Sequence, residues 1–306
     1  MPEIFRNTRT RFAPSPTGRM HLGHAYSALV AWQAAGCDAN RFLLRIDDID
    51  SSRCKDEFTD HLIDDLQWLG ISWNQPPLYQ SARRQRYDAA LAWLESEKLV
   101  YPCHLSRKEY EASLTAPQDS QNSPPVPNTA LHHTAVPALR LDMDRALAQI
   151  KLKNQSLIWQ THTGDAITAD PRSLGNVVLG RRNSPASYHL SVVIDDADSQ
   201  IDLVVRGDDL RASTDLHCLL QTLLGLPSPL YHHHELICDQ TGQRLAKRDK
   251  ARSLATYREN GLTINDVKSL LPPIKLLQLA FIAGGILACF WPASGPLLAL
   301  FWPNSD

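Results

Sequence analysis

Two histidines, His21 and His24, stand one helical turn apart near the start of the chain. They follow a turn rich in proline and glycine, Pro14–Gly18, and open an apolar run that predicts a helix over 22–36. The first turn of a helix offers backbone N–H groups and the positive end of the helix dipole, so it can hold a phosphate. Imidazole N–H groups placed there could stabilise charge that grows on a phosphoryl group, and Gly23 would let a nucleotide approach the backbone.

A second candidate for phosphate chemistry lies much later, in a polar segment that carries Arg244, Lys247, Arg248 and Lys250. We expect the cations of this segment to bind the same phosphates as the two histidines. Taken alone, each feature has an ordinary alternative. A pair of histidines is more often a surface or capping feature, and a basic segment is usually only solvated.

Further motifs follow in a fixed order and favour the catalytic interpretation. They are Arg11–Gly18, Leu44–Asp50, Arg181–Arg182, Tyr188–Leu190, Val193–Asp196 and Val205–Leu210. Together with the two phosphate motifs, this set resembles the glutamyl branch of the class I aminoacyl-tRNA synthetases over about residues 8–260. The resemblance implies an α/β fold, a Rossmann-like doubly wound parallel sheet with an inserted α+β subdomain. It also implies an enzyme that activates glutamate with ATP, with His21, Gly23, His24, Arg244 and Lys247 at the nucleotide. Within this set, the resemblance assigns catalytic roles to His21, His24 and Lys247.

Length distinguishes between members of this branch. Only residues 251–306 follow Lys250, too few for the large helical anticodon-binding region of a glutamyl-tRNA synthetase. The chain therefore resembles the truncated paralogues, the glutamyl-Q tRNA(Asp) synthetases. That resemblance implies activation of glutamate without bound tRNA, and transfer to the queuosine base in the anticodon of tRNA(Asp).

Three other interpretations stay open. The chain could be a short glutamyl-tRNA synthetase that charges a tRNA 3′ end, a non-catalytic tRNA-binding relic, or another nucleotidyltransferase of the superfamily. The presence of His21, His24 and Lys247 argues against the relic. Five cations could grip tRNA phosphates, and they are Arg181, Arg182, Arg211, Lys250 and Arg252.

Activation of glutamate requires groups that hold two carboxylates and an α-amino group. Arg11 and Arg206 are the candidates for the carboxylates, because guanidinium groups bind carboxylates in a bidentate manner. Asp47 is the candidate for the amine, where the family usually has glutamate; its alternative is a solvated strand end. The resemblance assigns substrate contacts to Arg11, Phe12, Ala13, Pro14, Ser15, Tyr188 and Arg206.

Two metals come into question. Mg²⁺ is expected with ATP because it neutralises phosphate charge, although the sequence offers no all-protein cage for it. The family commonly holds zinc in the inserted subdomain through three cysteines and a tyrosine, of which only Cys103 and Tyr110 match here. Zinc accepts mixed nitrogen and sulfur ligands, so Cys103 with His104, His132 and His133 is an alternative set. We expect a zinc-free insertion.

The remaining pattern predicts how these residues are positioned. Apolar periodicity predicts strands over 8–13, 41–46, 138–143, 157–160, 191–194 and 203–206, and helices over 55–69, 82–98 and 213–224, the last with Ser213 as its N-cap. We expect a first catalytic half over 1–100, an inserted acceptor-type subdomain over 101–185 with a mobile loop at 115–137, a second half over 186–260 and an apolar tail over 261–306. Ligands of doubly wound sheets bind at the carboxyl ends of the strands.

Composition fits such an enzyme without identifying it. The formal net charge is −2, so contacts to nucleic acid must come from local patches. Six cysteines without paired spacing favour reduced thiols, and the polar start of the chain lacks the apolar core of a secretory signal. We expect a cytoplasmic monomer. The apolar run 276–291 is shorter than the roughly 20 residues of a bilayer span, so we expect 276–302 to be a buried tail, with membrane contact as the alternative.

Overall fold

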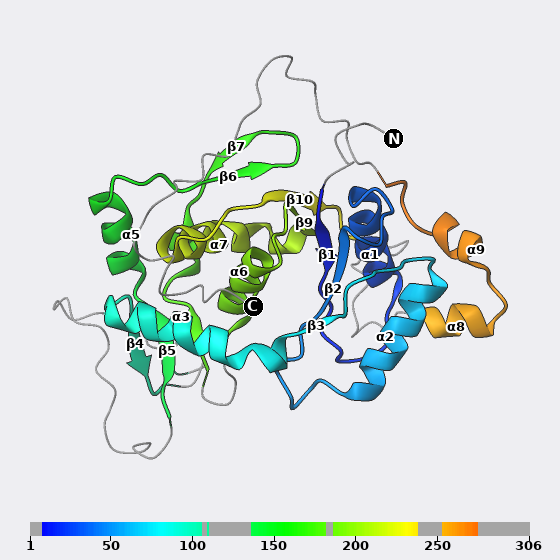
Figure 1. The fold of residues 1–306 in the computed structure, drawn as a ribbon, viewed down its shortest axis with the longest axis horizontal. Helices are drawn as coiled ribbons and strands as arrows, with labels where there is room; N and C mark the ends of the chain where they lie inside the picture. Colours follow the sequence, from blue (N-terminus) through cyan, green and yellow to red (C-terminus); the bar gives the residue numbers. More distant parts are fainter. Residues whose placement is uncertain (1–7, 106–108, 110–135, 182–185, 238–252, 275–306) are drawn as a thin grey trace.

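The computed structural model describes residues 8–105, 109, 136–181, 186–237 and 253–274 (Figure 1). Its central sheet has two parts. One has the order β1–β2–β3 and the other the order β7–β6–β10–β9, and every neighbouring pair is parallel except β6 with β7. The strands are β1 (Thr10–Phe12), β2 (Phe42–Ile46), β3 (Leu78–Tyr79), β6 (Ile158–Thr161), β7 (Ala166–Thr168), β9 (Leu203–Gly207) and β10 (Leu230–His234).

The two parts of the sheet meet where β1 lies beside β9 (Figure 1). There the backbone N–H groups of Asp202 and Leu203 donate to the carbonyl oxygen of Arg9, at 3.0 and 3.3 Å. The strand order therefore runs outward in both directions from a central β1–β9 contact. The predicted α/β class with a parallel, Rossmann-like sheet is confirmed.

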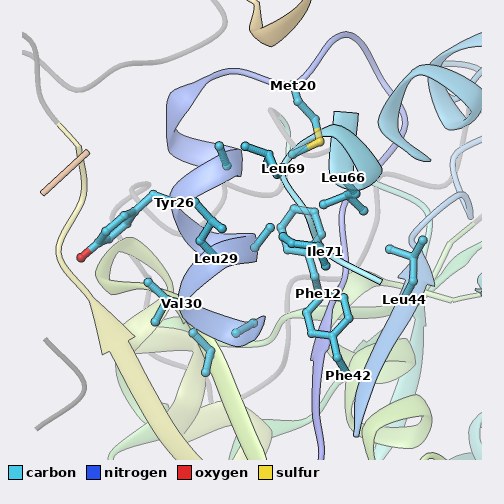
Figure 2. Packing of buried hydrophobic residues seen from close by; sticks show 14 of the residues in the cluster. Phe12, Met20, Tyr26, Leu29, Val30, Phe42, Leu44, Leu66, Leu69 and Ile71 are labelled. Atoms are coloured by element: carbon cyan, nitrogen blue, oxygen red, sulfur yellow. The ribbon is translucent and has the colours of Figure 1, made fainter. Parts of the chain in front are cut away.

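Helices cover both faces of the sheet (Figure 1). On one face the core joins α1 (Leu22–Ala34) to α2 (Asp56–Trp68), α8 (Leu254–Glu259) and α9 (Ile264–Ser269). Figure 2 shows part of this core, where Phe12 and Phe42 of the strands pack near Leu29 of α1 and Leu66 of α2. On the other face lie α6 (Tyr188–Asp198) and α7 (Arg211–Leu224), which pack with α3 (Arg84–Ser96) and α5 (Met143–Leu152).

A separate antiparallel sheet has the order β4–β5–β8, with β4 (Val100–Cys103), β5 (Ala138–Leu141) and β8 (Val178–Gly180). It lies within the stretch that the sequence predicts as an insertion. From the same stretch, β6 and β7 extend the edge of the central sheet instead. Short 3₁₀ helices complete the described elements at η2 (Gln80–Arg83), η3 (Pro171–Leu174) and η4 (Asp208–Leu210).

Two predicted elements were wrong. Residues 191–194, predicted as a strand, lie inside helix α6, which Ser187 caps by accepting a hydrogen bond from the backbone N–H of Leu190. A short buried apolar run fits a strand and a helix equally well, so periodicity could not separate them. Ser213 is not an N-cap, because α7 begins at Arg211 directly after η4. The other predicted strands and helices coincide with observed ones to within a few residues.

Side-chain alternation along three strands places one arginine of each strand on the α6–α7 side of the sheet. Their apolar neighbours Phe12, Phe42, Leu44, Leu203 and Val205 join the core on the α1 side. Arg11 and Arg45 contact α6, and Arg206 contacts α7. Among the described residues, no helix is long and apolar enough to cross a bilayer. The predicted apolar tail 276–302 and most of the predicted loop 115–137 lie outside the described residues.

Candidate active site

The two predicted catalytic histidines form the cap of α1. His21 is the N-cap residue, and its Nδ1 accepts a hydrogen bond from the backbone N–H of Gly23 at 3.1 Å. The Nδ1 of His24 accepts in turn from the backbone N–H of His21 at 3.3 Å. The rings stack with centroids 3.8 Å apart. The two imidazoles thus satisfy backbone donors that an uncapped helix would leave exposed.

This cap also decides which ring nitrogen carries a proton. Since Nδ1 of both rings accepts from a backbone N–H, the proton of each neutral imidazole sits on Nε2. Each Nε2 is then a hydrogen-bond donor at the positive end of the helix. Gly23 leaves room for this arrangement, because a Cβ at position 23 would lie 3.0 Å from Cε1 and 3.1 Å from Nδ1 of His21, and the ring would have to shift.

The chain returns to this cap after the predicted phosphate segment. The backbone N–H of Leu254 donates to the carbonyl oxygen of Met20 at 2.9 Å, and Ser253 forms an antiparallel bridge with His21. Leu254 is buried in the same core as Leu22. Lys247 and Arg244 lie outside the described residues. The described chain resumes six residues after Lys247, at the residue that pairs with His21.

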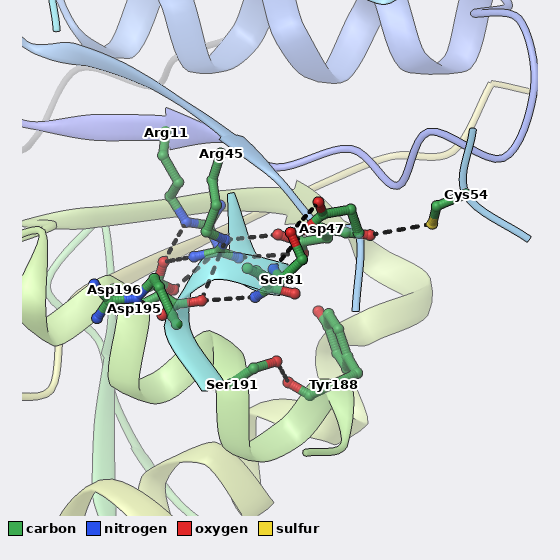
Figure 3. Close-up of polar contacts among 12 residues, drawn as sticks. Arg11, Arg45, Asp47, Cys54, Ser81, Tyr188, Ser191, Asp195 and Asp196 are labelled. Atoms are coloured by element: carbon green, nitrogen blue, oxygen red, sulfur yellow. Dashed lines mark hydrogen bonds and ion pairs between the residues drawn. The ribbon is translucent and has the colours of Figure 1, made fainter. Parts of the chain in front are cut away.

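A buried ion network joins β1 and β2 to α6 (Figure 3). Arg11 binds Asp196 through two hydrogen bonds, from Nε to Oδ1 at 2.9 Å and from Nη2 to Oδ2 at 3.1 Å. Arg45 bridges two carboxylates, donating from Nη1 to Asp196 at 2.6 Å and from Nε to Asp47 at 2.7 Å. All four side chains are less than one tenth exposed. The charge of Arg11 is therefore already matched by a carboxylate of the protein.

The two carboxylates of this network have opposite pKa shifts. Burial raises the pKa of Asp47 to about 6, although Arg45 acts against this. Asp196 is buried as well, but the guanidinium groups of Arg11 and Arg45 together hold its pKa below the usual value. For Asp47, burial and the negative charge of Asp195 outweigh the effects of Arg45 and Arg11, whereas Asp196 accepts hydrogen bonds from both guanidinium groups and these offset its burial.

Arg206, the second predicted carboxylate ligand, has a different environment. Its guanidinium donates from Nη2 to Thr214 Oγ1 at 2.6 Å, from Nη1 to His217 Nδ1 at 3.1 Å and from Nε to His233 Nε2 at 3.3 Å. It also lies 5.3 Å from the ring centroid of Tyr231. These partners are uncharged. No carboxylate within the described part of the chain forms an ion pair with this arginine.

The histidines around Arg206 are neutral for a physical reason. Burial, followed by the positive charge of Arg206, lowers the pKa of His217 well below its usual value and that of His233 to about 3. The same two causes lower the pKa of His189 to about 4. A protonated imidazole beside a buried guanidinium would add a second unpaired charge, so these rings stay neutral at neutral pH.

The other predicted substrate residues fall into three groups. Tyr188 is the first residue of α6 and contacts His189 and His217, with ring centroids 5.4 and 5.8 Å apart. Phe12 packs in the core on the α1 side. Ala13, Pro14 and Ser15 follow β1, where the carbonyl oxygen of Pro14 accepts from the backbone N–H of Asp47 at 3.0 Å.

The structure tests the predicted zinc ligands only in part. Cys103 is buried at the end of β4, and Tyr110, His132 and His133 lie outside the described residues. Within the described ranges, no group of three or more His, Cys, Asp or Glu residues is arranged to hold a metal. The zinc-free insertion stays a prediction.

Sequence reasoning gave no role to several residues that shape the site. Arg45 and Asp196 are the centre of the buried network, but the sequence analysis included them only as members of longer motifs and gave them no role. Thr214, His217 and His233 hold Arg206. Two sequence signals could have found them: polar residues on the buried face of α7, and the central residue of the run of three histidines on β10. The last histidine of this run, His234, points to the other face of the sheet, where its Nε2 forms a hydrogen bond with Ser27 Oγ at 2.8 Å.

Residues 7–268 match a family model described as "tRNA synthetases class I (E and Q), catalytic domain". A Glutamyl-Q tRNA(Asp) synthetase of Rhodobacter capsulatus is 44% identical over 86% of this chain and 99% of that protein. A protein of the same name from Nocardia farcinica is 38% identical over 85% of this chain and 82% of its own length. A glutamate–tRNA ligase of Parasynechococcus marenigrum is 34% identical over 86% of this chain but only 57% of its own length.

Solved structures show the same fold at lower identity. The glutamate–tRNA synthetase of Elizabethkingia anophelis superposes with a TM-score of 0.63 at 23% identity, covering 84% of this chain and 59% of that one. Methionyl-tRNA synthetase of Mycobacterium tuberculosis in complex with methionyl-adenylate superposes with a TM-score of 0.51 at 11% identity, covering 86% and 63%. This chain spans less than two thirds of each of those chains.

Proposed function

This chain belongs to the class I tRNA synthetases of the glutamyl and glutaminyl branch, and from that premise we propose that it activates glutamate with ATP and transfers it to queuosine in the anticodon of tRNA(Asp). The observation that carries the proposal is the charge of Arg206, which uncharged partners hold in place at the carboxyl end of β9. Coverage supports the choice within the family. The chain accounts for 99% of a relative named for this activity and for 57% of a glutamate–tRNA ligase.

Glutamate would be held mainly by two charged groups at the carboxyl ends of the strands, Arg206 and Asp47. Arg206 would bind the side-chain carboxylate, because its fork of N–H donors faces no carboxylate of the described protein. Asp47 would bind the α-amino group when the Asp47 carboxylate is ionised. Arg11 is paired with Asp196, so we propose that it mainly positions β1 against α6 and contributes a weaker field to the α-carboxylate.

ATP would be held at the first turn of α1. The Nε2–H groups of His21 and His24 and the helix dipole provide donors for the α-phosphate, and charge on that phosphate grows in the transition state. Lys247 and Arg244 are proposed to meet the other phosphates, since the chain pairs with His21 soon after them. Mg²⁺ would be coordinated chiefly by phosphate oxygens and water.

The reaction then has two displacements. A carboxylate oxygen of glutamate attacks the α-phosphorus of ATP, pyrophosphate leaves, and a mixed anhydride of glutamate and AMP results. A hydroxyl of the queuosine ring next attacks the acyl carbon, loses its proton, and expels AMP. The product is an ester on the anticodon base. The protein supplies orientation and electrostatic stabilisation, which suffice for most of the acceleration in such transfers.

Pyrophosphate exchange tests the first displacement. Labelled pyrophosphate should enter ATP when glutamate is supplied, without tRNA, and not with the other amino acids. Exchange that appears only after tRNA is added would favour a short glutamyl-tRNA synthetase. A protein that exchanges with no amino acid, with or without tRNA, would be a non-catalytic member of the family.

The acceptor is tested with matched tRNAs. tRNA(Asp) that contains queuosine should accept glutamate, and the same tRNA with guanosine at that position should not. As a control, queuosine-containing tRNA(Asp) that lacks its 3′ terminal adenosine should accept glutamate normally. Equal charging of both bases, or loss of charging with the shortened tRNA, would identify a 3′-end synthetase. The cytoplasmic location and the monomeric state stay predictions.

A further inference from the structure

His217 contacts two of the residues that are expected to meet glutamate. Its Nδ1 lies 3.1 Å from Nη1 of Arg206, and its ring centroid lies 5.8 Å from that of Tyr188. The side chain is only 2% exposed and lies on the buried face of α7. It was not predicted as a site residue, and none of the motifs discussed above includes it.

The hydrogen bonds of His217 allow a single arrangement of protons. A guanidinium can only donate, so Nδ1 of His217 accepts from Arg206. The neutral ring then carries its proton on Nε2, and this group donates to Nδ1 of His189 at 3.2 Å. His189, also neutral, carries its proton on Nε2. Arg206, His217 and His189 thus form one directed chain of donors.

The consequence for charge is seen by comparison with Arg11. The acceptor opposite Arg11 is the carboxylate of Asp196, which cancels its charge. The acceptors opposite Arg206 are a hydroxyl and two imidazoles, which fix the plane of the guanidinium but leave its charge in place. An imidazole is therefore suited to position 217 because it accepts a hydrogen bond without bringing a negative charge.

We propose that His217 is a positioning and specificity residue: it orients Arg206 through a neutral acceptor, so that the full charge of this arginine is available to an anionic amino-acid side chain. The inference rests on the proposed function, in which that side chain is glutamate. A carboxylate at position 217 would occupy Arg206 and compete with the substrate. A neutral acceptor of similar reach would not.

The test compares His217→Gln with His217→Asp. The Gln amide oxygen can accept from Arg206 without charge, and the Asp carboxylate pairs with it. In glutamate-dependent pyrophosphate exchange, we expect His217→Asp to raise the KM for glutamate by about tenfold or more and His217→Gln to raise it by less than about threefold. The KM for ATP should change little in either variant, and the preference for glutamate over glutamine should fall only in His217→Asp.

A second buried imidazole supplies the control. His162 is 8% exposed and its Nδ1 lies 3.2 Å from Nδ1 of His232, away from Arg206. His162→Gln and His162→Asp should leave the KM for glutamate unchanged. Circular-dichroism melting reports folding of all four variants, and if His217→Asp melts below the assay temperature, His217→Glu replaces it with the same expectation.

The outcomes separate the two claims. Wild-type protein without glutamate-dependent exchange contradicts the proposed function and this inference with it. If wild-type protein exchanges but the Gln and Asp variants raise the KM for glutamate equally, the charge argument is wrong. A rise in the KM for glutamate and in that for ATP by the same factor would show that His217 only supports the fold.

Discussion

Arg11 of β1 and Asp196 of α6 form a bidentate ion pair between side chains that are each 7% exposed. The pair joins positions that are far apart in the sequence, across the face of the sheet opposite α1 (Figure 3). Arg45 donates to the same carboxylate at 2.6 Å, so Asp196 stands between two guanidinium groups. Removing that carboxylate would leave two buried cations with less compensation, which is costly in a medium that solvates charge poorly.

Asp196→Asn should therefore destabilise the protein. We expect the free energy of unfolding to fall by about 3–5 kcal/mol, the range for breaking a buried ion pair on one side. Urea denaturation followed by circular dichroism measures this. The matched control is Asp144→Asn, because Asp144 pairs with Arg172 where both side chains are well exposed. That change should cost less than about 1 kcal/mol, and equal losses in the two variants would contradict the role of burial.

His24→Ala should slow adenylate formation. If the Nε2–H of His24 donates to the α-phosphate in the transition state, its loss should lower the rate of pyrophosphate exchange by about a hundredfold or more. Glutamate binding, measured by calorimetry, should stay nearly unchanged. His162→Ala serves as the control for loss of a histidine elsewhere. A His24→Ala protein with normal turnover would exclude a catalytic role and leave only the cap.

Gly23→Ala should separate catalysis from stability at the same cap. The new Cβ would lie 3.0 Å from the ring of His21, so the ring must move and its hydrogen bond from the backbone N–H of residue 23 must weaken. We expect turnover to fall by about tenfold or more, because small displacements of a catalytic group lower the rate strongly. The melting temperature should change little, since Ala favours helices over Gly. Unchanged turnover would show that the ring position does not matter.

The sequence predicted the fold correctly because the relevant signals are local, and the same kind of signal carries the predicted site, which stays a prediction. A Pro/Gly turn before a helix, and charged residues at strand ends, can be read from neighbouring residues. The different environments of Arg11 and Arg206 could not be predicted in this way. Whether Arg11 or Arg206 has a free charge depends on Asp196 and His217, which come from helices far along the chain.

Helix α6 could not be predicted from local sequence signals either. Its apolar run 191–194 fits a strand as well as a helix, and the two aspartates that follow give no direction by themselves. In the structure Asp196 faces the strands, whereas Asp195 accepts from Gln80 and Arg83 at 2.7 Å each. Both carboxylates lie near Arg45, at 3.9 Å for Asp195 and 2.6 Å for Asp196, and their other partners follow only from the packing of the helix.

Asp47 should make glutamate binding depend on pH. Burial raises its pKa from 3.8 to about 6, and the α-amino group requires the ionised carboxylate. As pH falls from 7 to 5, the protonated fraction of Asp47 grows, so the KM for glutamate in pyrophosphate exchange should rise. The KM for ATP should change less over the same range. In Asp47→Asn the KM for glutamate should be high at every pH and lack this dependence.

Ionisation of Asp47, which favours glutamate binding, should lower the free energy of unfolding. A carboxyl whose pKa is higher in the folded than in the unfolded protein binds its proton more tightly when folded, so its contribution favours folding at low pH and declines as pH rises from about 4 to about 6. Asp47→Asn removes this decline, and its stability relative to the wild type should increase over that interval in urea denaturation at several pH values. A difference in stability that does not vary with pH, together with a KM for glutamate that is flat between pH 5 and 7 in the wild type, would show that Asp47 is ionised throughout and does not titrate in the site.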